Sequence, residues 1–367
     1  MRVARREAPI AMTAPDEVAS PLASSGPGGP PDASVPGADA RGEATSARQA
    51  SERQTPERQT PERQTPERQT SERQTPERQA SERQTSERQT PAPRAPEPPH
   101  PLPLPVVDNH CHLDMGRDGA PRPDLTATLA QAAAVGVDRV VQIGCELESA
   151  HWTAQVVDSH PGLLGGVALH PNEAPHLAAA GRLEDALAQI EQLAAGERIR
   201  VVGETGLDYF RTPPQGRAAQ HESFRAHIEL AKRLDRTLQI HDRDAHDDVL
   251  DVLAQVGAPE RTVMHCFSGD IDMARECVRR GYYLSFAGTV TFKNARSLRN
   301  ALSIVPLELL LVETDAPYLT PTPHRGATNA PYLVPLTVRA MAGVLNVAVP
   351  TLCEALSDNS ERLYGPW

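Results

Sequence analysis

From residue 106 onward, short apolar segments alternate with longer amphipathic ones. Eight segments are short, rich in Val, Ile and Leu and bounded by polar or turn residues, a pattern typical of strands in a parallel sheet. They are 105–109, 139–144, 163–168, 199–203, 237–240, 262–264, 282–286 and 309–312. Between them, alanine-rich or amphipathic segments predict helices. These are 124–135, 149–159, 183–195, 215–233, 245–255, 271–280, 295–304 and 331–345, with one more at 350–363.

Regular alternation of strand and helix predicts an α/β fold with a parallel sheet. Eight such units in about 260 residues match the size of a (β/α)8 TIM barrel. An open, doubly wound sheet is the alternative. No glycine-rich phosphate-binding motif follows any predicted strand, which removes the main reason to prefer the open sheet.

Residues 1–105 lack this pattern. Eight blocks of the form [S/P]ERQ[T/A] run from Ser51 to Thr90. A polar five-residue unit has no apolar face to bury, and proline in half of the blocks interrupts helices. The sequence therefore predicts two parts: a disordered, low-complexity tail over 1–105 and a folded domain over 106–367.

Charge limits what the tail can do. It carries 14 Arg and 15 acidic residues, so it presents no net positive charge to phosphate and a nucleic-acid-binding arm is disfavoured. Two hypotheses stay open for the tail. It is a flexible interaction segment, or it is an artefact of an upstream start codon, since translation from near Val106 would still produce the whole predicted folded domain.

The folded part has 23 basic and 33 acidic residues, which argues against tight, sequence-independent binding of long duplex. No run of about 20 apolar residues predicts a membrane span, and no signal peptide is recognisable. Five cysteines at irregular spacing favour free thiols in a reducing compartment. We expect a cytoplasmic monomer without membrane contact.

Residues able to bind metal collect where the predicted strands end, which is where TIM barrels place their functional groups. They are His110, His112, His170, Glu204, His241, His265, Glu313 and Asp315. In a regular strand, alternate side chains share a face, so Asp108, His110 and His112 are expected to point one way and Cys111 the other. Seven other histidines, including His227, are expected to be structural or exposed.

Each of these groups, taken alone, fits an isolated polar cap on a strand. Burying several together is unfavourable without a counter-ion, and divalent cations are the natural partner. Four histidines and two carboxylates exceed a closed four-ligand zinc site and predict a two-metal cluster. The predicted ligands are His110, His112 and Asp315 for one ion and His241 and His265 for the other, with Glu204 bridging.

Six motifs then occur in one order: DNHCHLD, HPNE, GETGLDYF, IHDRD, HCFSG and ETDAPYLTP. Together they resemble the signatures of the TatD family of metal-dependent hydrolases, over residues 106–367 and not the tail. The resemblance implies a TIM-barrel deoxyribonuclease that trims single-stranded DNA ends from the 3′ side. It implies the same six ligands, and divalent ions of which Mg²⁺ is favoured, with Mn²⁺ or Zn²⁺ as alternatives.

The hypothesis for the mechanism is hydrolysis of a phosphodiester by a metal-activated water, with Glu204 or Asp315 transferring a proton. Asp108 and Glu313 are candidates for orienting the ligands. The side chains expected to contact substrate are His170, Asp208, Arg243, Ser268 and Arg325. Cys111 and Cys266 are assigned to packing inside the barrel wall.

Two other functions compete with this hypothesis. A metal-dependent esterase or deacylase, such as a D-aminoacyl-tRNA deacylase, would use the same ligands on another bond. A non-enzymatic scaffold would be expected to have lost some ligands, and all six are present.

Overall fold

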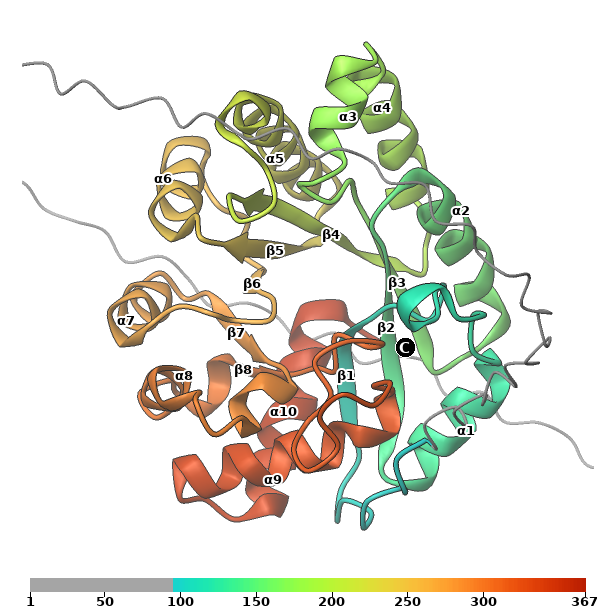
Figure 1. The fold of residues 1–367 in the computed structure, drawn as a ribbon, viewed down its shortest axis with the longest axis vertical. Coiled ribbons are helices and arrows are strands. Elements are labelled where there is room, and N and C mark those ends of the chain that lie inside the picture. Colours follow the sequence, from blue (N-terminus) through green and yellow to red (C-terminus); the bar gives the residue numbers. More distant parts are fainter. Residues whose placement is uncertain (1–94) are drawn as a thin grey trace, which may run out of the picture. The chain divides into compact units, whose positions relative to one another are not determined.

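Eight parallel strands lie in the order in which they occur along the chain, β1 to β8 (Figure 1). The computed structural model describes residues 95–367; the predictions for the repeats and for the rest of 1–94 lie outside the described residues. The strands are β1 Val106–Cys111, β2 Val137–Gly144, β3 Leu163–Val167, β4 Ile199–Asp208, β5 Thr237–Arg243, β6 Thr262–Met264, β7 Tyr283–Phe286 and β8 Leu310–Val312. This sequential order confirms the TIM barrel, because a doubly wound sheet reverses its order at a switch point.

The helices surround the strands (Figure 1). They are α1 Leu125–Ala134, α2 Leu147–Val156, α3 Ala174–Ala179, α4 Leu183–Ala194, α5 Pro214–Leu234, α6 His246–Val256, α7 Ile271–Arg279, α8 Arg296–Leu302, α9 Val334–Leu345 and α10 Val349–Tyr364. The short α3 was not predicted from the sequence, because six residues that include a proline give no helical periodicity. Strand β4 is also longer than predicted and includes Glu204.

The barrel closes between β1 and β8 through bonds near the strand ends. The Asn109 side-chain amide donates to the carbonyl of Val312 at 2.8 Å. Beyond β8, the amide of Asp315 donates to the carbonyl of His110 at 3.0 Å. These bonds connect the segments that carry the first and last predicted ligands.

The barrel interior is apolar at the end where the strands begin. A buried cluster fills it, made of Val107, Val141, Ile143, Leu164, Val201, Val263 and Leu311 with Leu363 and Tyr364. The last two residues belong to α10, and the hydroxyl of Thr237, at the start of β5, donates to the Leu363 carbonyl at 2.7 Å. The end of α10 therefore closes this side of the barrel, and the predicted ligands lie at the opposite end.

Strand β1 departs from the regular alternation expected from the sequence. Its register against β2 shifts between Asp108 and Cys111, so three steps along β1 match two along β2. Such an irregularity redirects side chains. Cys111 packs in the large core cluster as expected, while Asp108 turns to the amide and hydroxyl of Thr314, at 2.8 and 2.6 Å.

Residues 95–105, which were predicted to belong to the tail, include positions that pack against the barrel. Pro96 is buried, and its carbonyl accepts a hydrogen bond from the Tyr332 hydroxyl at 2.8 Å. Leu102 is also buried and its amide donates to Val135 at 2.9 Å. Proline-rich composition hid this segment, because extended chain can pack without any helical or strand periodicity.

Within residues 95–367, no single helix combines the length and apolar character needed to cross a membrane. One pair, Pro331–Leu345 with Val349–Tyr364, satisfies both criteria only when joined, and it is bent by 111°. Both helices bury residues in the protein core, among them Met341 and Leu356.

Replacement of Asn109 by Ala should destabilise the barrel. The variant removes the side-chain donor to the Val312 carbonyl and the acceptor for Ser360, whose hydroxyl keeps only the Leu356 carbonyl, so the free energy of unfolding should fall by about 1–3 kcal/mol. Urea denaturation measures the change. The matched control is Asn300→Ala on the exposed side of α8, which should shift stability by less than about 0.5 kcal/mol. Equal stability of the two variants would contradict this account of barrel closure.

Candidate metal centre

The predicted ligands converge around the carboxylate of Glu204, which β4 carries into the barrel mouth. One oxygen, Oε1, lies 2.5 Å from His241 Nδ1 and 3.1 Å from His265 Nε2. The other, Oε2, lies 3.6 Å from His110 Nε2 and 3.8 Å from His112 Nε2. Glu204 is thus placed between the two sets of histidines that were predicted to hold separate ions.

Asp315 completes the cluster from the opposite wall. Its Oδ1 lies 3.5 Å from His112 Nε2 and 4.0 Å from His110 Nε2. The backbone of Asp315 is left-handed, with φ of 53°, a conformation uncommon for residues other than glycine. The bond from its amide to the His110 carbonyl holds this turn. The sharp turn after β8 therefore directs the carboxylate back over the cluster.

The two histidines of β1 meet in a way that fits a cation. Both Nδ1 atoms face pure acceptors: His110 faces Gln239 Oε1 at 2.8 Å and His112 faces the Ile143 carbonyl at 3.1 Å. Both Nδ1 atoms must therefore carry the hydrogen, which leaves lone pairs on both Nε2 atoms. These Nε2 atoms are only 3.3 Å apart. Two lone pairs at that distance repel unless a proton or a metal ion lies between them.

Charge is concentrated here with little water. Burial opposes ionisation of Glu204, but His265 and His170 more than offset it and hold the pKa of that carboxyl well below its usual value. Burial likewise disfavours the cationic form of His241, yet its bond to Asp208 prevails and raises its pKa to about 9. Carboxylates that attract this much positive charge from imidazoles are equally suited to divalent cations.

The donor atoms form three groups within 4.8 Å: His110, His112 and Glu204; His110, His265 and Asp315; and His170, Glu204 and His241. The trio predicted to share one ion, His110, His112 and Asp315, is also compact, with 3.3 to 4.0 Å between its Nε2 and Oδ1 atoms. His265 stacks on His110, with ring centroids 3.7 Å apart, while His170 meets His241 edge-on at 4.6 Å. His170, predicted to contact substrate, therefore also stands in a position to bind metal.

Polar side chains deeper in the barrel contact several of the predicted ligands. Gln239, on β5 two residues before His241, accepts from His110 and donates to the Asn109 carbonyl at 2.9 Å. Sequence reasoning missed it, although a glutamine within an apolar strand was a visible signal. Glu313 lies 3.0 Å from His265 Nδ1, as expected for an orienting group. Within the described residues, Asp108 contacts no imidazole ring, and its carboxylate accepts from the His110 amide at 3.4 Å and from Thr314.

The cluster lies at the floor of a cleft of about 730 Å³. Four of the five residues predicted to contact substrate line it: His170, Asp208, Arg243 and Ser268. Ser268 is exposed. Asp208 is only 1% exposed and its carboxylate is engaged by His241 and by the Arg211 amide, so it positions protein groups. Arg325 is not among the lining residues; its guanidinium lies 3.8 Å from the Phe292 ring centroid.

Two cysteines lie at the cleft, contrary to the assignment of Cys266 to packing alone. Cys266 is half-buried and lines the cleft, and its amide donates to Glu313 at 2.7 Å. Cys145 lies with its Sγ 3.7 Å from Glu204 Oε2. Burial raises the pKa of Cys145 to about 12, so its thiol stays protonated at neutral pH. No motif marks Cys145, which directly follows β2.

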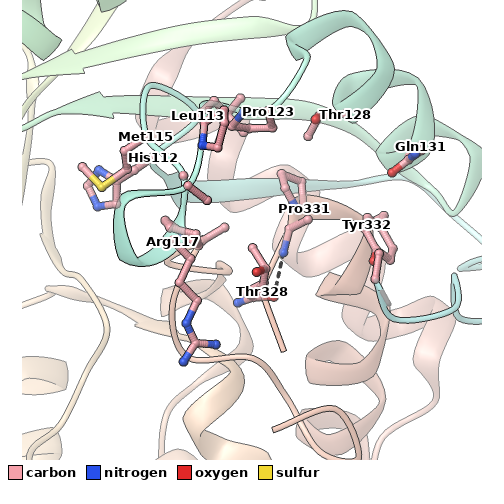
Figure 2. A pocket seen from close by; sticks show the side chains of 18 residues that line it. His112, Leu113, Met115, Arg117, Pro123, Thr128, Gln131, Thr328, Pro331 and Tyr332 are labelled. Atoms are coloured by element: carbon pink, nitrogen blue, oxygen red, sulfur yellow. Dashed lines mark hydrogen bonds between the residues drawn. The ribbon is translucent and has the colours of Figure 1, made fainter. Parts of the chain in front are cut away.

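A second, smaller pocket adjoins the cluster (Figure 2). Its volume is about 220 Å³, and His112 and Met115 line both it and the larger cleft. Figure 2 shows His112 and Met115 at one end and Tyr332 at the other. Its polar groups are largely engaged: Arg117 donates to the carbonyls of Gly326 and Ala327. The pocket therefore presents mainly apolar surface.

An eight-stranded barrel whose carboxyl end gathers imidazoles and carboxylates in an open cleft defines a class, the metal-dependent hydrolases built on TIM barrels. The comparisons with known proteins place the chain within that class. The family model described as TatD related DNase matches residues 107–365. The chain therefore belongs to the TatD family of metal-dependent hydrolases, as its motifs had indicated.

The relatives cover the same region. The metal-dependent hydrolase TatD of Mycobacterium tuberculosis is 46% identical over 265 residues, which is 71% of this chain and 98% of that protein. The hydrolase YcfH of Escherichia coli K12 is 37% identical, covering 71% and 95%. Among solved structures, YJJV, a TatD homologue from E. coli K12, matches with a TM-score of 0.64 and 28% identity, over 71% and 97%.

A buried histidine supports the turn that carries His170. His227 on α5 accepts a hydrogen bond from the Leu169 amide at 3.1 Å and donates to the Ser223 carbonyl at 2.7 Å. This confirms its predicted structural role. Burial lowers the pKa of His227 to about 4, only partly offset by the bond to Ser223.

His227 should make stability depend on pH between about 6.5 and 4. In that window His227 is protonated in the unfolded chain but neutral in the folded protein. The contribution of His227 to the free energy of unfolding is therefore fully present at pH 7 and decreases as pH falls. The loss should reach about 3 kcal/mol at pH 4. The difference in free energy of unfolding between wild type and His227→Gln, measured by urea denaturation, should decrease by that amount from pH 7 to pH 4. His151→Gln, at an exposed position, should show a constant difference; a constant difference for both variants would refute the assignment.

Proposed function

We propose that this TatD-family hydrolase is a deoxyribonuclease that removes nucleotides from the 3′ ends of single-stranded DNA. The observation that carries the proposal is the Glu204-centred cluster at the floor of the open cleft. Its donors suit two divalent cations, and two cations favour an anionic phosphodiester over a neutral substrate. The family model's description as a DNase supports the same substrate.

The proposed metal ligands are His110, His112, Glu204, His241, His265 and Asp315, and the geometry supports His170 as a seventh. Mg²⁺ is the favoured ion on the family resemblance, and Mn²⁺ or Zn²⁺ are the alternatives, because carboxylates suit Mg²⁺ and Mn²⁺ whereas imidazoles suit Zn²⁺. When bound, such ions would lower the pKa of water and neutralise charge on the reacting phosphate.

Side chains of the protein are proposed to transfer the proton and to orient the phosphate. Asp315 is the more accessible carboxylate, with its side chain 19% exposed against 6% for Glu204, so its Oδ atoms are placed to take a proton from the attacking water. The imidazole of His112 keeps the pKa of Asp315 low against the effect of burial, which maintains the ionised form. Arg243 and Ser268 line the wall where they would orient the phosphate.

The proposal includes the setting of the reaction. Single-stranded DNA ends are the proposed partner, and the enzyme is proposed to act as a cytoplasmic monomer. All five cysteines are free, which fits a reducing compartment.

The metal-loaded protein should shorten a 5′-labelled single-stranded oligonucleotide one nucleotide at a time. His110→Ala and Glu204→Ala should each lower the rate at least about 100-fold, because loss of an outer partner alone often costs 10- to 100-fold. Chelation with EDTA should abolish cleavage, and gel electrophoresis of the products follows the reaction.

The control for this experiment is His151→Ala, on the exposed side of α2, which should cleave like wild type. The same preparations are offered D-aminoacyl-tRNA. Hydrolysis of that ester with no cleavage of DNA would contradict the nuclease and favour a deacylase.

Gln239→Leu should weaken metal binding by about 10- to 100-fold, because His110 loses the acceptor that fixes its tautomer. Gln239→Glu keeps an acceptor for His110 and should bind within a few-fold of wild type. Calorimetric titration of the metal-free protein with Mn²⁺ measures both variants. Equal affinities for Leu and Glu would show that Gln239 does not orient the ligand.

A further inference from the structure

Two aromatic rings stand exposed beside the cleft. Phe210 is 62% exposed and Tyr318 is 42% exposed, and within the described part of the chain they are the exposed large hydrophobic residues. Both follow strands at their carboxyl ends: Phe210 comes two residues after β4 and Tyr318 comes three after Asp315. A single exposed ring needs no explanation in itself, so the significance of these two rings lies in where they stand, at the edge of the barrel that carries the predicted ligands.

Both rings are mounted on fixed backbone. The Tyr318 amide donates to the Asp315 carbonyl at 3.0 Å, and its own carbonyl accepts from the Asn329 side chain at 2.7 Å. Phe210 sits in a turn closed by Asp208, whose carboxylate accepts from the Arg211 amide at 2.8 Å. The neighbouring Tyr209 amide bonds to the Arg243 carbonyl at 2.9 Å. A rigid ring loses little entropy when a ligand stacks on it.

Positive charge lies next to one ring. The Arg243 guanidinium lies 3.9 Å from the centroid of Phe210, and Arg243 also lines the metal-capable cleft. The Arg243–Phe210 pair therefore offers a flat apolar face together with a cation that faces the site of the phosphate.

The two rings flank the cluster. In the order β1 to β8, β4 and β8 lie four positions apart, which is opposite in an eight-stranded barrel. Tyr318 lines the cleft on the Asp315 side, while Arg243 lines it on the side of Asp208 and His241 and holds the Phe210 ring just outside the lining. A chain bound across the cleft, with one phosphate at the cluster, would pass one ring on each side.

We propose that Phe210, backed by Arg243, and Tyr318 are stacking platforms for nucleobases on the two sides of the bound phosphate. This inference rests on the proposed nuclease function and gives it a basis for selecting single strands. Every base has a π-face, so stacking is tolerant of sequence, but a base becomes available only when it leaves its duplex. Two separated rings on the walls of a cleft also lack the continuous apolar patch that a protein partner would need.

Binding without turnover tests the platforms. The full-length, Mg²⁺-loaded protein is titrated, by fluorescence anisotropy, into 5′-labelled dT12 with phosphorothioate linkages, which resist cleavage, and into a set in which one of the four 3′-terminal bases is removed to leave an abasic sugar. Phe210→Ala and Tyr318→Ala should each weaken binding of dT12 by about 5- to 100-fold. For each ring, one abasic position should weaken binding to wild type but not to the corresponding Ala variant.

Conservative variants separate stacking from loss of fold. Phe210→Trp and Tyr318→Phe keep a ring and should bind dT12 within about threefold of wild type. Trp152→Leu removes another aromatic that contacts an arginine, Arg122, but lies on α2 outside the cleft lining, and it should have no effect.

Several outcomes would overturn the platforms. One is that the Ala variants bind dT12 with the affinity of wild type. Another is that each abasic position weakens binding equally for wild type and for the Ala variants, and a third is that wild type does not bind dT12. Any of these results, with the Mg²⁺-loaded wild type still cleaving unmodified single-stranded DNA, removes the platforms and leaves the nuclease. Wild type that binds the phosphorothioate dT12 but never cleaves unmodified dT12 removes the nuclease instead.

Discussion

The arrangement depends on one electrostatic constraint: a carboxylate, Glu204, buried among imidazoles whose lone pairs face one another. His110 and His112 bring their Nε2 atoms to 3.3 Å with both Nδ1 hydrogens already committed. Such a cluster is stable only with positive charge inside it, supplied by protons or by metal ions. The geometry of the surrounding barrel serves to hold these groups together despite their mutual repulsion.

The barrel achieves this by separating its two ends. Where the strands begin, valines, isoleucine and leucines close the interior, and Tyr364 from α10 plugs it. Gln239 joins the two layers, since its amide contacts the Tyr364 hydroxyl at 3.0 Å while its oxygen orients His110. The apolar end provides stability, and the polar end is free to keep unfavourable contacts that become useful when cations and substrate arrive.

In the proposed function, substrate binding depends on other groups than the chemical step does. The folded part is acidic overall, so attraction of a polyanion must be local: bound cations at the floor and arginine at the wall. Aromatic faces such as those of Phe210 and Tyr318 add contact area that does not depend on charge. A site built in this way would favour flexible strands with free bases over long, stiff duplex.

The sequence by itself determined the class of fold and which end of the barrel carries the predicted ligands, because strand and helix periodicities are local and parallel strands bring their carboxyl ends to one edge. It did not determine which histidines face each other. That depended on the register shift in β1 and on the stacking of His265 on His110, which are contacts between strands. The role of Gln239, the approach of His170 to Glu204 and the packing of Pro96 were likewise decided only by tertiary structure. Each joins residues far apart in the chain, and no local pattern encodes such a meeting.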